Sequence, residues 1–137
     1  NRARCLRLDM MHDVALEDAP TPDAARALDA ITHTWGVSPM TGREHLTMTL
    51  NIDETDEKFV LQRLRREGRQ GVVTRLAENR FRYDIEVSDA GEMMGWVKSF
   101  TGRIAQLESD NASAAERFND DMRRMAGMYG LTDDDAV

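Results

Sequence analysis

The residues able to perform chemistry are scattered along this chain and form no catalytic or metal-binding motif. His12, His33 and His45 lie far apart, and Cys5 is the only cysteine. A metal site would therefore need ligands that converge from distant positions. The sequence contains no glycine-rich phosphate loop, nucleophile elbow or HExxH pair. We expect no catalytic residues, no metal and no cofactor, and we predict that the chain is not an enzyme.

Charge is distributed unevenly along the chain. The net charge of −7 argues against a dedicated non-specific nucleic-acid binder. Residues 58–82 nevertheless hold eight basic residues against two acidic ones, whereas residues 108–137 hold three basic against eight acidic. This pattern fits either two solvated helix faces of opposite bias or an interaction surface, and both interpretations stay open. Our candidates for contact with an anionic effector are Arg63, Arg66, Arg80 and Arg82.

Two aromatic residues that resemble an RNA-binding motif are better explained as core residues. Phe81 and Tyr83 lie two positions apart, as in sheets that stack RNA bases on their outer face. Turning these rings outward would point Arg82, Asp84 and Glu86 into the core. Burying unpaired charges costs more free energy than exposing two rings recovers. We predict that both aromatics are buried and that the outer face of their strand is polar.

Methionines at helical spacing mark a second candidate surface near the C-terminus. Such methionines fill cores more often than they line a binding groove. A helix over residues 111–129 nevertheless needs an apolar surface to pack on, and a second subunit would supply one. We name Phe118, Met122 and Met125 as candidate dimer contacts.

The elements that must position these residues follow from two hydrophobic periodicities. Alternation with a period of two predicts strands over residues 46–52, 72–76, 81–87 and 104–108. Helical spacing and capping residues predict helices from Asp53 to Gly68 or Gly71, from Ser88 to Gly102, and from 111 to 129. The resulting βαββαβ order is that of the ferredoxin-like sandwich. The predicted fold class is therefore α+β, a ferredoxin-like sandwich with an extra C-terminal helix and an N-terminal strand-helix appendage.

The N-terminal part predicts an appendage to this sandwich. Residues 5–10 alternate weakly, which suggests a strand without a nearby partner. Pro20 and Pro22 interrupt the chain, and Pro22 suits the first position of a short helix that ends near Trp35. Because the chain begins with Asn1, we expect a fragment of a longer protein. We divide it into a terminal strand (1–19), a helix and linker (20–45), the sandwich (46–130) and a tail (131–137).

Several function classes are disfavoured by these patterns. The same fold hydrolyses acyl phosphates when an arginine-bearing loop after the first strand holds the phosphate, but residues 53–56 are acidic here and would repel an anion. No apolar run approaches the roughly 20 residues that cross a bilayer, so we expect no membrane association. The single cysteine fits a reducing compartment.

Two segments resemble the C-terminal part of bacterial transcriptional regulators that contain a WYL domain. Residues 92–108 and Tyr129 are similar to the C-terminal extension (WCX) of these regulators, in which an acidic helix start, an apolar helix, a glycine, a short strand and a final helix follow one another. Residues 4–11 resemble the closing strand of the WYL domain, and the positions that match its usual pattern are Arg4, Arg7, Leu8 and Asp9. Residues 1–19 would then be the end of the WYL domain.

The resemblance implies a non-catalytic regulatory and dimerisation module of a DNA-binding transcriptional regulator. In such proteins an N-terminal winged-helix domain binds DNA and the WYL domain responds to an effector. The implied protein is a cytoplasmic homodimer whose effector is single-stranded nucleic acid or a small molecule, with Arg4 and Arg7 near the effector site. The alternative is a ferredoxin-like (ACT-like) sensing domain that binds a small molecule between its subunits.

Overall fold

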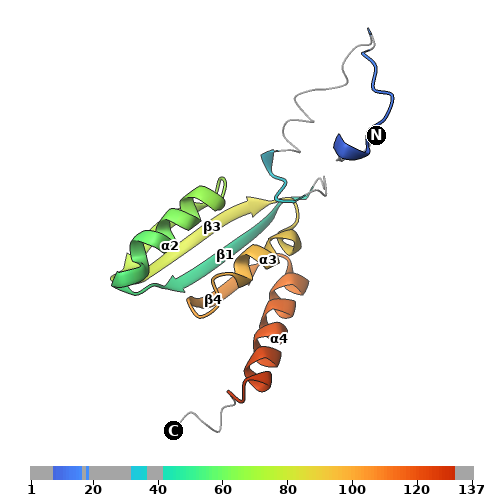
Figure 1. Cartoon of the computed structure of the whole chain (residues 1–137). Helices are drawn as coiled ribbons and strands as arrows, with labels where there is room; N and C mark the ends of the chain where they lie inside the picture. Colours follow the sequence, from blue (N-terminus) through green and yellow to red (C-terminus); the bar gives the residue numbers. More distant parts are fainter. Residues whose placement is uncertain (1–7, 17, 19–31, 37–41, 132–137) are drawn as a thin grey trace.

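The two strands with the clearest alternation form the centre of a four-stranded sheet (Figure 1). In the computed structural model, which describes residues 8–16, 18, 32–36 and 42–131, β1 (Glu44–Asn51) and β3 (Arg80–Val87) lie side by side. The edge strands are β2 (Val72–Ala77) and β4 (Ile104–Ser109), and the order across the sheet is β2-β3-β1-β4. Every pair is antiparallel. This is the strand arrangement of a ferredoxin-like sandwich.

The helices complete the predicted order of elements. α2 (Glu54–Glu67) connects β1 to β2, and a short 3-10 helix, η2 (Ala90–Met93), continues directly into α3 (Met94–Lys98) between β3 and β4. A last helix, α4 (Ala112–Met128), follows β4. The βαββαβ order and the extra C-terminal helix confirm the predicted fold class. η1 (Leu8–Met10) is the one regular element described before β1.

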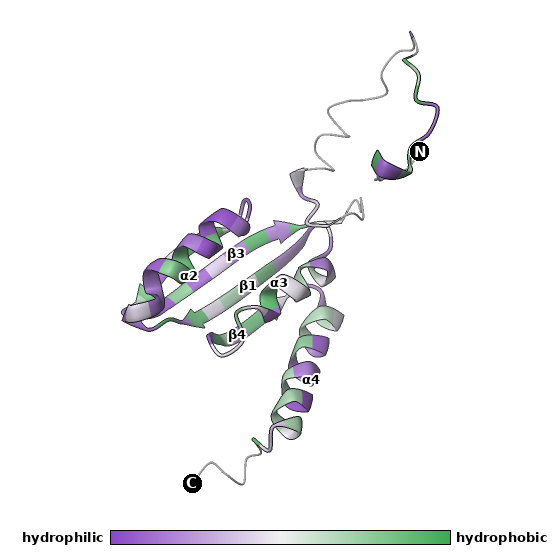
Figure 2. Cartoon of the chain, in the orientation of Figure 1, coloured by the Kyte–Doolittle hydropathy of each residue, from purple (hydrophilic) through white to green (hydrophobic). Residues whose placement is uncertain are grey.

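The core lies between one face of the sheet and the helices. Hydrophobic and hydrophilic residues follow each other along β1 and β3 (Figure 2), and the hydrophobic ones point inward. Phe81 and Tyr83 are buried, as predicted. The buried residues that pack on this face from the helices and from the turn after α3 include Val60, Leu61, Leu64, Met93, Val97 and Phe100. The register pairs Thr47 with Asp84 and Thr49 with Arg82 on the other face, which confirms its polar character.

Tyr83 requires glycine where the chain passes between α2 and β2. Its hydroxyl donates a hydrogen bond of 2.7 Å to the carbonyl oxygen of Gly68. A Cβ atom on Gly71 would lie 2.1 Å from Cε2 of the Tyr83 ring, so a larger residue has no room there. Burial raises the pKa of the Tyr83 phenol well above its ordinary value of 10.0, which keeps the hydroxyl protonated as a donor.

Local capping explains where the helices begin. Asp53 precedes α2, and the acidic residues of the first turn (Glu54, Asp56 and Glu57) complement the helix dipole. The Asp89 carboxylate accepts a hydrogen bond from the Gly91 N–H at the start of η2, and the Asn111 side chain accepts one from Ala114 N–H at the start of α4.

The structure corrects two of the predicted elements. The second helix was expected to reach Gly102, but α3 ends at Lys98, and Gly102 instead adopts a φ of +89° in the turn before β4. Leu8–Met10 forms a 3-10 turn rather than the end of a strand, because no described strand pairs with it. The remainder of that predicted strand, residues 5–7, and the helix predicted after Pro22, up to residue 31, lie outside the described residues.

Replacing Tyr83 with Phe tests the contact that joins the sheet to the end of α2. The variant removes this hydrogen bond, whereas the Gly68 carbonyl oxygen keeps the one from the Gly71 N–H at 2.9 Å, so we expect the free energy of unfolding to fall by about 1 kcal/mol. Urea denaturation measures this difference. The matched control is Tyr129→Phe, because the Tyr129 ring is exposed, and this variant should stay within ~0.5 kcal/mol of the wild type. Equal stability of both variants would contradict the assignment.

Candidate functional site

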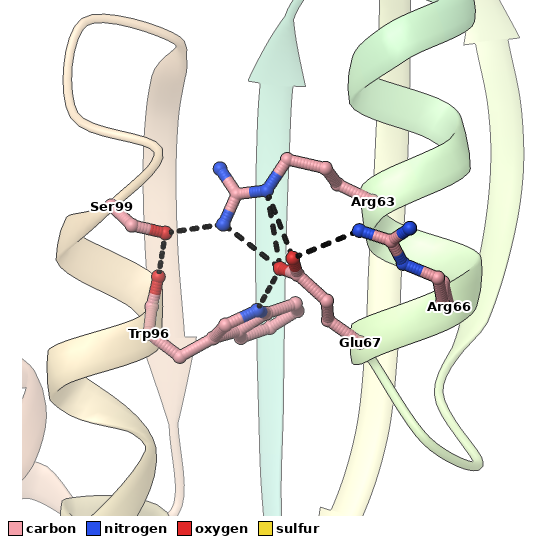
Figure 3. Close-up of polar contacts among 5 residues, drawn as sticks. All are labelled: Arg63, Arg66, Glu67, Trp96 and Ser99. Carbon is pink, nitrogen blue, oxygen red and sulfur yellow. Dashed lines mark hydrogen bonds and ion pairs between the residues drawn. The ribbon is translucent and has the colours of Figure 1, made fainter.

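Glu67 and Trp96 join the two helices that cover the sheet (Figure 3). The Glu67 carboxylate on α2 accepts a hydrogen bond of 2.9 Å from the indole N–H of Trp96 on α3. Arg63, one turn earlier on α2, donates to the same carboxylate at 2.8 Å. The Arg63 guanidinium also donates to the Ser99 hydroxyl at 3.0 Å, so it too connects α2 with the end of α3.

The charge of Glu67 is held in place rather than prepared for proton transfer. The hydrogen bond from Arg63 and then that from Trp96 lower the pKa of Glu67 below its ordinary value, against a smaller opposing effect of burial. Arg66 lies 3.9 Å from the carboxylate and adds to this effect. A general acid or base is tuned toward neutral pH, and Glu67 is shifted the other way. The cluster is therefore a structural contact that connects α2 and α3.

Trp96 is also the centre of an aromatic cluster that holds the segment before β1. Its ring centroid lies 4.9 Å from that of Phe100, 5.3 Å from that of Tyr83 and 4.9 Å from that of Trp35. Residues 32–36, which we call the strap, are thereby packed against the sandwich. The Arg69 guanidinium lies over the Trp35 ring, 4.9 Å from the ring centroid.

Hydrogen bonds to two backbone carbonyl groups of the strap fasten it further. The carbonyl oxygen of His33 accepts hydrogen bonds from the backbone N–H of Ser88 at 2.8 Å and from its hydroxyl at 3.2 Å. Arg69 donates to the carbonyl oxygen of Thr34 at 2.6 Å. The strap is thus tied to the end of β3 and to the turn after α2. A movement of the chain before β1 would be transmitted to both places.

The structure separates the four arginines predicted to contact an anionic effector. Arg63 and Arg66 lie on α2, whereas Arg80 and Arg82 point from β3 to the opposite, outer face of the sheet. The two pairs therefore cannot hold one small ligand together. Arg63 is engaged with Glu67, and Arg82 donates to Asp84 at 2.7 Å. Arg66 remains 73% exposed. Arg4 and Arg7 lie outside the described residues.

The outer face of the sheet neutralises much of its own charge. Asp84 accepts hydrogen bonds from the Thr47 hydroxyl at 2.8 Å and from Arg82. Glu86 lies within 3.2 Å of His45 and 3.5 Å of Arg43. These paired side chains, without an aromatic platform on β1 or β3, do not form the kind of surface that stacks nucleic-acid bases.

The predicted dimer contacts on α4 divide into buried and accessible residues. Phe118 is only 6% exposed and packs in the core of its own domain, so it cannot also be a free contact surface. Met122 is half-buried, and its sulfur lies 3.9 Å from the Thr101 hydroxyl. Met125 is also half-buried. The most exposed apolar residues of this C-terminal region lie at the end of α4 and just after it: Met128 at 79%, Tyr129 at 75% and Leu131 at 66%.

A cavity of about 500 Å³ lies where η2 and α3 meet α4. Its lining combines charged residues of both signs with the apolar residues Met94, Ala114 and Phe118. One wall is closed by the ion pair between Lys98 of α3 and Asp121 of α4. The hydrogen bond from Lys98 lowers the pKa of Asp121, which keeps this pair charged.

Sequence reasoning missed the residues that organise these features. Arg63 and Glu67 stand four apart on a helix, a spacing that does signal a side-chain pair. The partnership of Glu67 with Trp96 and that of Trp35 with Trp96 connect positions far apart in the chain, and no local pattern indicates either one.

Comparisons with known proteins do not add a family assignment to this geometry. No family model matches the chain, and no curated protein matches it. Within the described residues, no three His, Cys, Asp or Glu side chains are grouped so that they could hold a metal ion. No helix in that part of the chain is long and apolar enough to cross a membrane.

Replacing Glu67 with Gln tests the contact between α2 and α3 through its pH dependence. Because folding lowers the pKa of Glu67 from 4.5, its stabilising effect is complete above that pH and is lost as the pH falls below it. We expect the variant to be less stable than wild type near pH 7 and the difference to shrink toward about pH 3. Urea denaturation across this range measures it.

The control for this measurement is Glu116→Gln on the exposed side of α4. It removes one carboxylate without breaking a contact between helices, so its stability should follow that of the wild type at each pH. A Glu67→Gln variant whose stability also follows the wild type throughout would refute the stabilising role of the Glu67 charge.

Proposed function

We propose that this chain is a non-catalytic regulatory and dimerisation module of a cytoplasmic, DNA-binding transcriptional regulator that responds to an effector. The observation that carries the proposal is the unpartnered apolar end of α4. A 17-residue helix is attached to the sandwich by its first half, with Ala114 and Phe118 as its buried residues. Its second half ends in the exposed side chains of Met128, Tyr129 and Leu131. Such a surface favours association with another protein.

The charges on α4 favour a second copy of the same helix as the partner. Asp120 and Arg124 lie one turn apart on α4, and both are more than 70% exposed. If two α4 helices pair in antiparallel orientation through the face that carries Asp120 and Arg124, about a two-fold axis midway between these residues, each Asp120 faces the Arg124 of the other copy. A two-fold interface must be self-complementary in this way. Met122 points the other way, toward the core of its own domain.

The strap supports the regulatory part of the proposal. Residues 32–36 connect the sandwich to the chain that precedes it, and Trp35, Ser88 and Arg69 fasten this connection. In a regulator that resembles WYL proteins, the preceding part would hold the effector-sensing domain and, further upstream, a winged-helix domain that binds DNA. A fixed connection would let a change in that part alter the position of α4 in the dimer.

One observation favours the alternative, a ferredoxin-like module that senses a small molecule. The cavity between η2, α3 and α4 has the volume and mixed lining of a small-molecule site. It lies within one chain, whereas the ACT-like arrangement expected from the sequence places the ligand between subunits. The two functions are compatible, because a ligand in this cavity would contact α4.

The mass of the chain in solution tests the dimer proposal. We expect light scattering over a concentration series to show a dimer, and the double substitution Met128→Glu, Leu131→Glu to weaken it at least ~10-fold, because two apolar side chains lose their buried partner. The control is Val72→Glu, which places a single glutamate at an exposed apolar position of the edge strand β2.

The outcomes separate the possible contact surfaces. A dimer that is lost with Val72→Glu and kept with the α4 substitutions would assign the contact to the sheet edge instead. A wild-type chain that stays monomeric at the highest concentration would remove the support for α4 as a self-association surface.

A further inference from the structure

The cavity between η2, α3 and α4 has two walls of opposite charge. Asp89 and Glu92 belong to the segment that begins η2, and Arg117 belongs to the first half of α4. Its volume of about 500 Å³ lies within the ~300–1,000 Å³ of small-ligand sites. A site with both charges inside one cavity discriminates between ligands by the sign and position of their own charges.

The α4 wall suits a carboxylate. Ser113 and Arg117 lie four residues apart on α4, so their side chains share one face of the helix, and both line the cavity. No described residue forms a hydrogen bond or ion pair with Arg117, whereas Arg123 and Arg124 on the same helix are both paired with aspartates. Arg117 can therefore bind an incoming carboxylate with both of its terminal nitrogens.

The opposite wall suits an ammonium group. The Asp89 carboxylate uses Oδ1 to accept the Gly91 N–H at 2.8 Å, and its other oxygen is not engaged by a described residue. Glu92 also lines this wall and adds to its negative charge. Met94 and Phe118 supply apolar surface to the same cavity. The ion pair between Lys98 and Asp121 neutralises the remaining two charges of the lining and links α3 to α4.

We propose that this cavity binds a small zwitterion of the size of an amino acid, with its carboxylate on Arg117 and Ser113, its ammonium group on Asp89, and its side chain against Met94 and Phe118. An inorganic dianion fits less well because the η2 wall would repel it. An organic cation lacking a carboxylate would leave Arg117 unpaired. The proposal of a binding site depends on the cavity alone. Any influence of the bound ligand on dimerisation through α4 rests on the function proposed above.

Nuclear magnetic resonance titration of the ¹⁵N-labelled chain tests the site. Each of the standard L-amino acids is added to millimolar concentration, with inorganic phosphate as the anion control. We expect at least one amino acid to cause saturable shifts at the amides of Gly91, Ser113 and Arg117. The amine and the acid obtained by removing its carboxylate or its ammonium group should each bind at least ~10-fold more weakly, since each loses one charge-assisted contact.

Matched variants assign the binding to this cavity. Arg117→Met should weaken binding at least ~10-fold, and Asp89→Asn should weaken it while still accepting the Gly91 N–H. Arg123→Met removes an arginine from the same helix outside the cavity lining and should bind as the wild type does. The absence of saturable shifts with every amino acid, unchanged binding by Arg117→Met, or tighter binding of phosphate would each overturn the proposal.

Light scattering with and without the bound amino acid separates this proposal from the previous one. Binding to a chain that stays monomeric would uphold the site and reject the dimer. A dimer that binds none of the amino acids would uphold the dimer and reject the site.

Discussion

The packing of Trp96 is the contact on which the rest of this structure depends. Its ring meets Tyr83 of the sheet, Phe100 after α3 and Trp35 of the strap, and its N–H is bonded to Glu67 of α2. The N–H of a partly buried indole needs a hydrogen-bond acceptor, and a carboxylate is a strong one. Glu67 is available for this role because Arg63 stabilises its charge. One side chain thus fixes the spacing of both helices over the sheet and the path of the chain before β1.

This arrangement places α2, η2 and α3 on one side of the sheet and leaves two surfaces with different properties. The outer face of the sheet is exposed but polar, and its charges pair among themselves around Asp84 and Glu86. The distal part of α4 is exposed and apolar. Water solvates the first surface well, whereas the second exposes apolar area that association would remove from water. The physical asymmetry between them favours α4 over the outer face of the central strands as an interaction surface.

The fold was largely predictable because its signals are local. The alternation along β1 and β3 determines which residues face the core, and the turn residues around Asn79, which has a φ of +60°, determine the hairpin. The candidate site was less predictable. Whether Arg63 and Arg80 share a surface depends on which layer of the fold each element occupies. Phe118 shows the same apolar pattern in the sequence whether it packs within its own domain or against another subunit.

The position of the cavity links the two proposed properties of the chain. Its η2 and α3 wall belongs to the part of the sandwich that Trp96 fixes, whereas its other wall is the first half of α4. The Lys98–Asp121 pair is the polar bridge between these walls, and Asp121 directly follows Asp120, which the proposed dimer contact would use. A ligand that contacts both walls would favour one orientation of α4 over others. By thermodynamic linkage, dimerisation through α4 would then change the affinity for the ligand by the same factor as the ligand changes the affinity for the second subunit. Regulation in this chain would therefore need no large rearrangement of the sheet, because the strap, Trp96 and α3 already form a continuous packed connection from the preceding chain to α4.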